Sequence, residues 1–273
     1  MLRTTGLNLS AFAADIPPVM AVASEPSRGV VRVELSTPAA FSGRVRFQDD
    51  AAELFARWRA ALLECDRPIA VDVAIDLQGL GEAKEPPARL WQLSHRPIDY
   101  AFYADAPLTE KIGLFGTRFR AMLAAGAFEL GTEIIEASPL AMMELLEFKG
   151  VYRGGRAHLG KKGWRADNAQ RRPDKVFAAA LKELGFNPAG PGAERLDAAE
   201  FNAIVCALTA LGSKLGEGVV SSEVMAEEIT ARCNRRMNSQ DSEETWQAPN
   251  GVSVLGGPFW ESVDIRRKPS AAA

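Results

Sequence analysis

The residues best suited to chemistry are two carboxylates at the ends of short apolar runs. Asp76 closes IAVDVAID at residues 69–76, and Glu136 closes TEIIE at residues 132–136. Because side chains alternate along a strand, Asp72 and Asp76 share one face of the first run. A buried carboxylate needs a partner or a metal ion, and open α/β sheets bind ligands at the carboxyl ends of their strands. The pattern indicates a cation site or, alternatively, carboxylates that accept hydrogen bonds from the turns and helices that follow.

Two asparagines also stand in apolar surroundings. Asn8 lies within TGLNLSAFAA at residues 5–14, and Asn202 precedes the apolar run AIVCALTALG at residues 203–212. An amide oxygen can ligate a cation, although it contributes no charge. The alternative for each asparagine is a buried amide that hydrogen-bonds to the backbone and holds a strand or helix in place.

Composition argues against several other kinds of site. The 273 residues include two histidines and three widely spaced cysteines, which provide little material for a zinc site or a Ser-His-Asp triad and do not suggest a disulfide framework. No GxxxxGK[ST] motif or glycine-rich phosphate loop favours phosphoryl transfer from ATP. No apolar run approaches the roughly 20 residues of a membrane span. We expect a cytoplasmic protein without a membrane segment, and the sequence indicates no oligomeric state.

Positive charge is concentrated in one segment. The net charge is −3 and the pI about 5.6, so any surface for nucleic acid must be local. Residues 149–175 contain the aromatic residues Tyr152 and Trp164, and their candidate nucleic-acid-binding residues are Lys149, Arg153, Arg156, Lys161, Lys162, Arg165, Arg171 and Arg172. Basic side chains neutralise phosphates and aromatic rings stack on unpaired bases. The alternative is a solvated loop without a specific partner.

The order of predicted elements places these residues on a mixed sheet. Strands at 5–14, 19–24 and 30–35 have connections too short for a crossover, which predicts antiparallel pairing. A helix capped by Asp49 follows, and strands at 68–77 and 132–138 alternate with a helix at about 107–125. Such alternation is typical of parallel, buried strands. The fold class is therefore α/β, with three antiparallel strands followed by parallel strands and flanking helices.

The remaining elements complete one predicted domain over residues 1–273. Helices are expected at 139–148, 174–184, about 196–215 and 222–235, and a hairpin at 245–256. The Pro- and Gly-rich stretch 78–106 and the basic segment 149–175 read as loop insertions. Residues 262–273 are expected to form a flexible tail.

Four of these segments resemble a known family. AVDVAIDLQGL resembles the "IDxPLGL" strand of the predicted ribonuclease H-like nucleases, and IIEASP resembles their "EVHP" segment. FNAIVCALTA resembles their "DAxxCAxTA" helix, and GLNLS resembles their first strand, "GIDxS". The resemblance runs from about residue 5 to about residue 212. It implies a ribonuclease H-like fold whose acidic residues hold two divalent ions, Mg²⁺ or Mn²⁺, for phosphodiester hydrolysis.

The resemblance also assigns residues to that site. It implies that Asp76, Glu136, Asn8 and Asn202 are the catalytic and metal-binding set, and the position of Glu200 just before Asn202 makes it a further candidate metal ligand. Asn8 and Asn202 stand where the family has aspartates, which weakens the implied metal site unless neighbours such as Asp72, Asp197 or Glu200 substitute. Two hypotheses follow: a metal-dependent nuclease weakened at two ligands, or a non-catalytic module that binds nucleic acid or a protein partner through residues 149–175.

Overall fold

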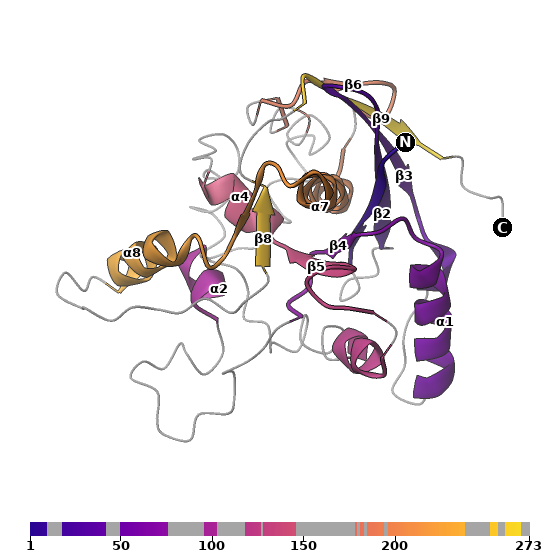
Figure 1. The fold of residues 1–273 in the computed structure, drawn as a ribbon, viewed down its shortest axis with the longest axis horizontal. Coiled ribbons are helices and arrows are strands. Elements are labelled where there is room, and N and C mark those ends of the chain that lie inside the picture. Colours follow the sequence, from indigo (N-terminus) through magenta and orange to yellow (C-terminus); the bar gives the residue numbers. More distant parts are fainter. Residues whose placement is uncertain are drawn as a thin grey trace, which may run out of the picture.

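A nine-stranded mixed sheet organises the part of the chain that the computed structural model describes. That part comprises residues 1–9, 18–41, 50–75, 96–102, 118–126, 128–145, 178, 181–182, 185–193, 196–237, 252–255 and 260–268. The strand order is β6-β9-β3-β2-β1-β4-β5-β8-β7, with helices on both faces (Figure 1). The predicted α/β class is confirmed at this level.

The centre of the sheet follows the predicted order. Strands β1 (Arg3–Asn8), β2 (Val19–Ser27) and β3 (Val30–Ser36) pair antiparallel. Strands β4 (Ile69–Val71) and β5 (Ile134–Ala137) then continue the sheet in parallel from β1. Strand β4 is shorter than the predicted 68–77, although the amide of Asp72 still donates to the carbonyl of Leu7 at 3.3 Å.

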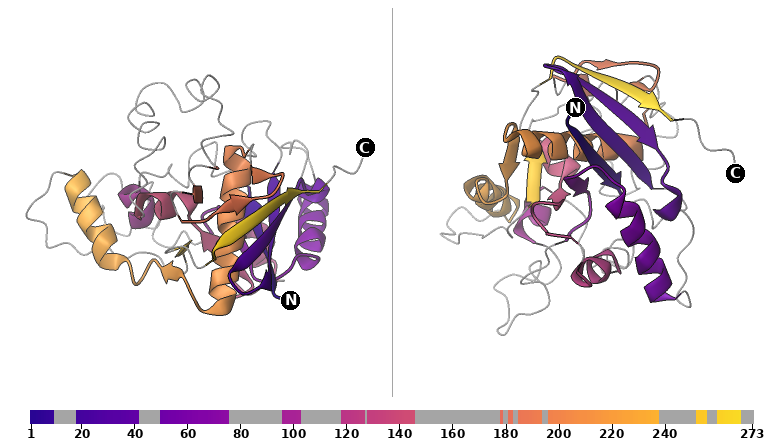
Figure 2. Two further views of the ribbon diagram at one scale, coloured as in Figure 1. Left: turned by 90° about the horizontal axis from the view of Figure 1, so that it is seen from above. Right: turned by 45° about the vertical axis from the view of Figure 1, so that its right-hand side comes forward.

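Two helices cover the two faces of these central strands. Helix α7 (Ala198–Leu215) packs on one face, and helix α1 (Ala51–Leu63) packs on the other, as Figure 2 shows. The α1 face buries Leu54, Trp58 and Leu62 against Leu7 and Val71. The alternation of side chains along β1 thus sends odd-numbered residues toward α1 and even-numbered residues toward α7.

Helix α7 approaches β1 closely because Gly6 has no side chain. A Cβ atom at residue 6 would lie 2.2 Å from the amide nitrogen of Ala207 and 2.3 Å from the carbonyl oxygen of Ala203. The hydroxyl of Thr4 donates to the Ala207 carbonyl at 3.1 Å. Near the C-terminal end of the helix, the Lys214 ammonium donates to the carbonyl of Arg3 at 3.1 Å. Helix α7 therefore runs antiparallel to β1, with its N-terminal end toward Asn8.

The chain end departs from the predicted hairpin and flexible tail. Strand β8 (Val252–Leu255) lies between β5 and β7 (Val219–Ser221). Both of its edges are therefore occupied by strands other than the hairpin partner that the sequence predicted. Strand β9 (Ser262–Arg267) lies between β3 and β6 (Pro188–Ala189). The flexible-tail prediction is thus wrong for residues 262–267, because Val263 and Ile265 are fully buried in the core.

The helices show smaller differences from the prediction. The N-cap of α1 is Asp50 instead of Asp49, and its carboxylate accepts from the Glu53 amide at 3.0 Å. A short helix, α2 (Pro97–Ala101), lies within the stretch predicted as a loop. Further described helical elements are η2 (Ala39–Phe41), residues 118–124, α4 (Pro139–Leu145) and α8 (Ala226–Arg236), and residues 178 and 181–182 are also helical.

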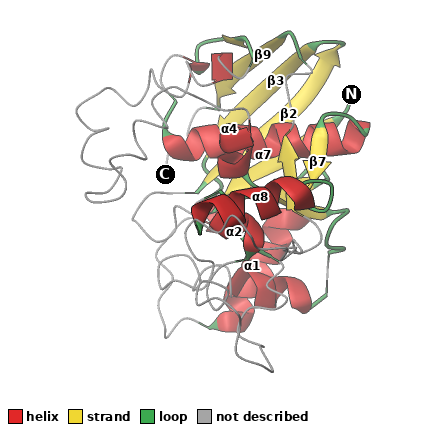
Figure 3. Ribbon diagram, turned by 90° about the vertical axis from the view of Figure 1, so that its left-hand side faces the viewer, coloured by secondary structure: helices red, strands yellow, loops and turns green. Residues whose placement is uncertain are grey.

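The predicted C-terminal helix corresponds to α8. Helices α8 and α2 lie side by side at one end of the sheet (Figure 3). Within the described ranges, no helix is both long enough and apolar enough to cross a membrane.

We predict that Gly6→Ala lowers the free energy of unfolding by about 1–3 kcal/mol, since the added methyl group meets the backbone of α7. Thermal unfolding followed by circular dichroism measures the loss. Gly126→Ala is the control, because a Cβ there meets no atom within 4 Å and only the backbone φ of 83° opposes it. A Gly6→Ala variant that melts no lower than the control would contradict the close contact.

Candidate functional site

Asn8 and Asp72 form a polar pair at the carboxyl ends of β1 and β4. The side-chain amide of Asn8 donates to Oδ2 of Asp72, and the backbone amide of Leu9 donates to Oδ1 of Asp72 at 2.8 Å. Asn8 is 1% exposed. The carboxylate thus accepts hydrogen bonds on both oxygens, and it joins the ends of two adjacent strands on the α7 face of the sheet.

Asn202 lies on α7 toward the same edge of the sheet. One turn along the helix is Cys206, which is fully buried. Burial raises the pKa of the Cys206 thiol, and the Asp72 carboxylate nearby raises it further. Residues four apart share a helix face, and α7 runs antiparallel to β1, so Asn202 stands nearer than Cys206 to the strand end that carries Asn8. Three predicted polar positions, Asn8, Asp72 and Asn202, therefore belong to one face.

Glu136 lies on the opposite face. In the parallel register, Leu7 pairs with Val71, and Val71 pairs with Glu136. Leu7 and Val71 both belong to the core under α1. The residues on either side of Glu136, Ile135 and Ala137, pack on the α7 face of the sheet with Cys206. The sheet therefore separates Glu136 from the Asn8–Asp72 pair, which the sequence had assigned to one site with it.

An arginine that sequence reasoning missed neutralises Glu136. Arg96 Nη2 donates to Glu136 Oε1 at 2.6 Å, and Arg96 Nη1 donates to Glu136 Oε2 at 2.9 Å. The Ile75 amide also donates to Glu136 Oε2, at 2.8 Å. Arg96 is 4% exposed and Glu136 is 6% exposed. Both oxygens of the predicted metal ligand are thus held by a buried guanidinium.

Asp99 completes this cluster from α2. Its carboxylate accepts from Arg96 Nε at 2.7 Å and from Arg96 Nη2 at 2.9 Å. It also accepts from the Arg96 backbone amide at 3.2 Å, so it caps α2 as well as pairing with the guanidinium. Burial by itself lowers the pKa of Arg96, but the two carboxylates together outweigh burial and raise that pKa. We call Arg96, Asp99 and Glu136 the arginine cluster.

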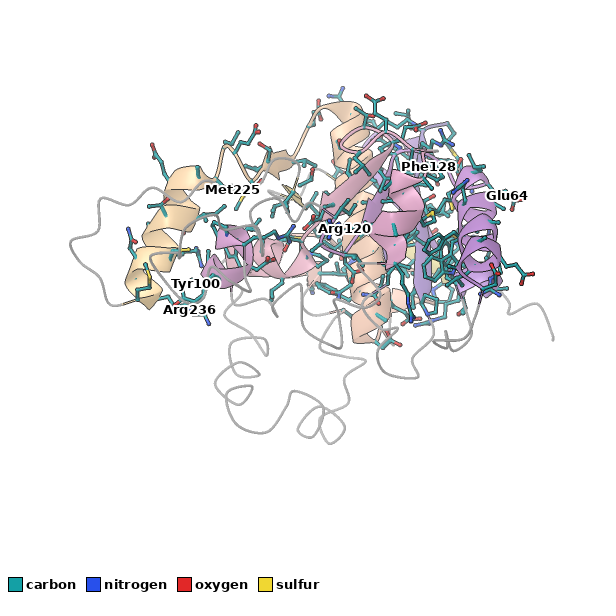
Figure 4. The ribbon with its side chains drawn as sticks, turned by 90° about the horizontal axis from the view of Figure 1, so that it is seen from below. Glu64, Tyr100, Arg120, Phe128, Met225 and Arg236 are labelled. Atoms are coloured by element: carbon teal, nitrogen blue, oxygen red, sulfur yellow. The ribbon has the colours of Figure 1, made fainter. Side chains whose placement is uncertain are left out.

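Helix α2, which follows Arg96, also contacts helix α8. The Arg236 guanidinium lies 4.0 Å from the centroid of the Tyr100 ring, and the two labelled side chains are adjacent in Figure 4. The Cys233 thiol lies 3.5 Å from the Pro97 carbonyl oxygen, to which it donates. Residues 97–101, which follow Arg96, are therefore held between β5 and α8.

Glu200 has a structural role at the start of α7. It forms a capping box with Asp197, in which each side chain accepts from the other residue's backbone amide, at 2.8 and 3.0 Å. The Arg267 guanidinium of β9 donates to both Glu200 oxygens, at 2.7 and 2.9 Å. These contacts direct the Glu200 carboxylate toward β9.

The other predicted site residues lie outside the described residues. They are Asp76 and the basic residues of 149–175, so the structure does not place them. Among the described residues, no three His, Cys, Asp or Glu side chains gather as a metal site requires. The described members of the predicted set do not fit a two-metal centre, because the sheet separates them and Arg96 already holds Glu136.

One signal in the sequence points to the missed residues of the arginine cluster. HRPID at residues 95–99 places an arginine before a proline and an aspartate three positions later, which is a helix-start pattern with charge at both positions. This signal does not identify the further partner, because Glu136 lies 40 residues from Arg96 in sequence.

We predict that Asp72→Ala destabilises the protein by about 1–3 kcal/mol, since it removes the buried carboxylate that accepts from the Asn8 side chain and from the Leu9 backbone amide. The matched control is Asp66→Ala, which removes a carboxylate whose side chain is 40% exposed and pairs with Arg3. It should cost less than about 1 kcal/mol. Chemical denaturation measures both variants, and equal losses would argue against the Asn8–Asp72 pair.

Comparisons with known proteins identify no relative of this chain. No protein-family model, no curated protein and no solved structure matches the chain. The polar groups at the carboxyl ends of β1, β4 and β5 are therefore interpreted from their own contacts.

Proposed function

We propose that the chain is a ribonuclease H-like module that binds nucleic acid through residues 149–175 and does not cut it. The observation that carries the proposal is that the Arg96 guanidinium donates hydrogen bonds to both carboxylate oxygens of Glu136. A guanidinium there repels a divalent ion from the carboxylate that the family resemblance assigns to the metal. The Asn8 amide, which donates to Asp72, likewise stands where the resemblance assigns an anionic ligand.

The strand order supports the ribonuclease H-like part of the proposal. Three antiparallel strands come first, β4 and β5 extend the sheet in parallel from β1, and α7 packs across β1. The four segments that resemble the family lie at β1, at β4 and the residues after it, at β5 and on α7. Three of them therefore belong to the central strands of the sheet, and the fourth belongs to the helix that packs across β1.

The charge of the basic segment supports nucleic acid as the partner. Residues 149–175 carry nine lysines and arginines against two aspartates, whereas the whole chain has a net charge of −3. The segment follows α4, which begins two residues after β5 ends. Phosphate contacts of this kind release counterions, so they give binding that weakens as salt increases.

We predict that fluorescence anisotropy detects salt-sensitive binding to single-stranded DNA or RNA without divalent metal. Arg171→Gln with Arg172→Gln should weaken binding and reduce the slope of log K against log salt by about 0.7 for each phosphate that the variant no longer neutralises. The control is Arg28→Gln with Arg57→Gln, two exposed arginines elsewhere. Equal weakening in both pairs would show that net charge alone drives binding, and absence of binding would contradict the proposal.

One observation favours a second candidate, a metal-dependent nuclease. The Asp72 carboxylate lies beside Asn8 at the carboxyl ends of β1 and β4, where the face of α7 also carries Asn202. Changing both asparagines to aspartate would place three carboxylates on this face.

We predict that the unmodified protein does not cleave single- or double-stranded DNA or RNA with Mg²⁺ or Mn²⁺. Asn8→Asp with Asn202→Asp should also be inactive, because Glu136 stays with Arg96, and the added charge beside Asp72 should lower stability. A gel assay with labelled substrates measures cleavage. Activity in the unmodified protein would overturn the binding-only proposal, and activity in the double variant alone would identify a disabled metal site.

A further inference from the structure

Arg59 on helix α1 is a half-buried cation that lacks a counter-ion among the described residues. Its Nε atom is shielded from solvent and has no hydrogen-bond partner, and no described residue forms an ion pair with its guanidinium. Polar and charged groups that leave water are ordinarily paired, because an unpaired group loses hydration without compensation. The guanidinium of Arg59 is therefore suited to bind an anion that comes from outside the described structure.

Arg59 lies on the flank of α1 that faces the helix at residues 118–124. Trp58 points into the core, so the residues before and after it, Arg57 and Arg59, lie on opposite flanks of α1. Glu64 follows Arg57 by about two helical turns and therefore shares its flank. Figure 4 shows Glu64 on the side of α1 that is farther from helix 118–124. Arg59 is consequently on the nearer side.

Helix 118–124 directs Arg118 toward α1. Its Phe119 is buried in the same core as Trp58. The two helices run in the same direction, because each leads to the amino end of one of the parallel strands β4 and β5. The residue that precedes the inward residue therefore points to the same side on both helices, which is the side of α1 for Arg118. Arg120, on the opposite flank, points away from α1 in Figure 4.

The facing flanks of these helices carry positive charge without a described carboxylate. Glu53 and Glu64 lie on the other flank of α1, and residues 118–124 contain no acidic residue. Asp66 and Glu133, near the amino ends of β4 and β5, are already paired with other arginines. We call Arg59 and Arg118 the two-arginine site.

We propose that the two-arginine site binds a phosphate group of the nucleic-acid backbone; the identity of this partner rests on the proposed function. A guanidinium offers a phosphate two parallel hydrogen bonds, which are stronger than those between neutral groups. Partial burial strengthens them further, because the local dielectric constant is lower than that of water. The phosphate supplies the counter-ion that Arg59 lacks among the described residues. Nucleic acid thus contacts the helices of the α1 face in addition to residues 149–175.

The test measures binding of a labelled single-stranded oligonucleotide by fluorescence anisotropy over a series of NaCl concentrations. Arg59→Gln should weaken binding about tenfold, as expected when one charge-assisted contact is lost. It should also reduce the slope of log K against log salt by about 0.7. Arg118→Gln should have the same kind of effect, and Arg59→Lys should retain the slope because it retains the charge. The matched control is Arg57→Gln on the opposite flank of α1, which should change both quantities little.

Two measurements of melting temperature separate the site from the fold and from the proposed function. Arg59→Gln should melt within about 2 °C of Arg57→Gln, because Arg59 has no described partner whose loss would destabilise α1. Sodium pyrophosphate, compared with NaCl of equal ionic strength, should stabilise the unmodified protein more than Arg59→Gln.

The outcomes distinguish this proposal from the proposed function. Equal oligonucleotide binding by Arg59→Gln and Arg57→Gln would overturn the two-arginine site and leave the proposed function standing. A pyrophosphate response that needs Arg59, in a protein that binds no oligonucleotide, would overturn nucleic acid as the ligand. A loss of affinity and of salt dependence confined to Arg59→Gln and Arg118→Gln supports the proposal.

Discussion

The close contact between Gly6 and helix α7 is the constraint on which the described structure depends. It brings the backbone of an 18-residue helix against the backbone of the strand at the centre of the sheet. From that position α7 reaches strands on both sides of β1 and fills the core between them with small and branched residues. A side chain at residue 6 would lift the helix and open this core, since packed interiors do not absorb such volume.

The position of α7 also decides which polar groups can meet. Even-numbered residues of β1 face the helix, so Asn8 and Asp72 lie under α7 at the strand ends. The parallel register places Glu136 beside Val71 on the other face. The buried carboxylates on the two faces are therefore stabilised differently. Hydrogen-bond donors satisfy Asp72 on the α7 face, and a guanidinium neutralises Glu136 on the α1 face.

Local pattern was sufficient to predict the centre of the fold but not its edges. The short connections between β1, β2 and β3 leave antiparallel pairing as the only option, and the alternation in IAVDVAID identifies β4 and its inward residues. Strand β9 was not predicted because SVDIRR ends in two charged arginines, and the Arg267 guanidinium pairs with Glu200 of α7. The Arg267–Glu200 pair is a tertiary contact that the sequence around residue 262 does not display.

The candidate site was harder to predict for the same reason. The sequence shows that a carboxylate such as Glu136 stands in an apolar segment and therefore needs a partner. It does not show whether that partner is a metal ion or an arginine 40 residues away. The difference matters for chemistry. A metal ion keeps positions open for water and substrate oxygen, whereas the guanidinium of Arg96 directs three nitrogens at two carboxylates of its own chain. A site filled in this way holds α2 against the sheet, so the cluster has a structural role in this chain.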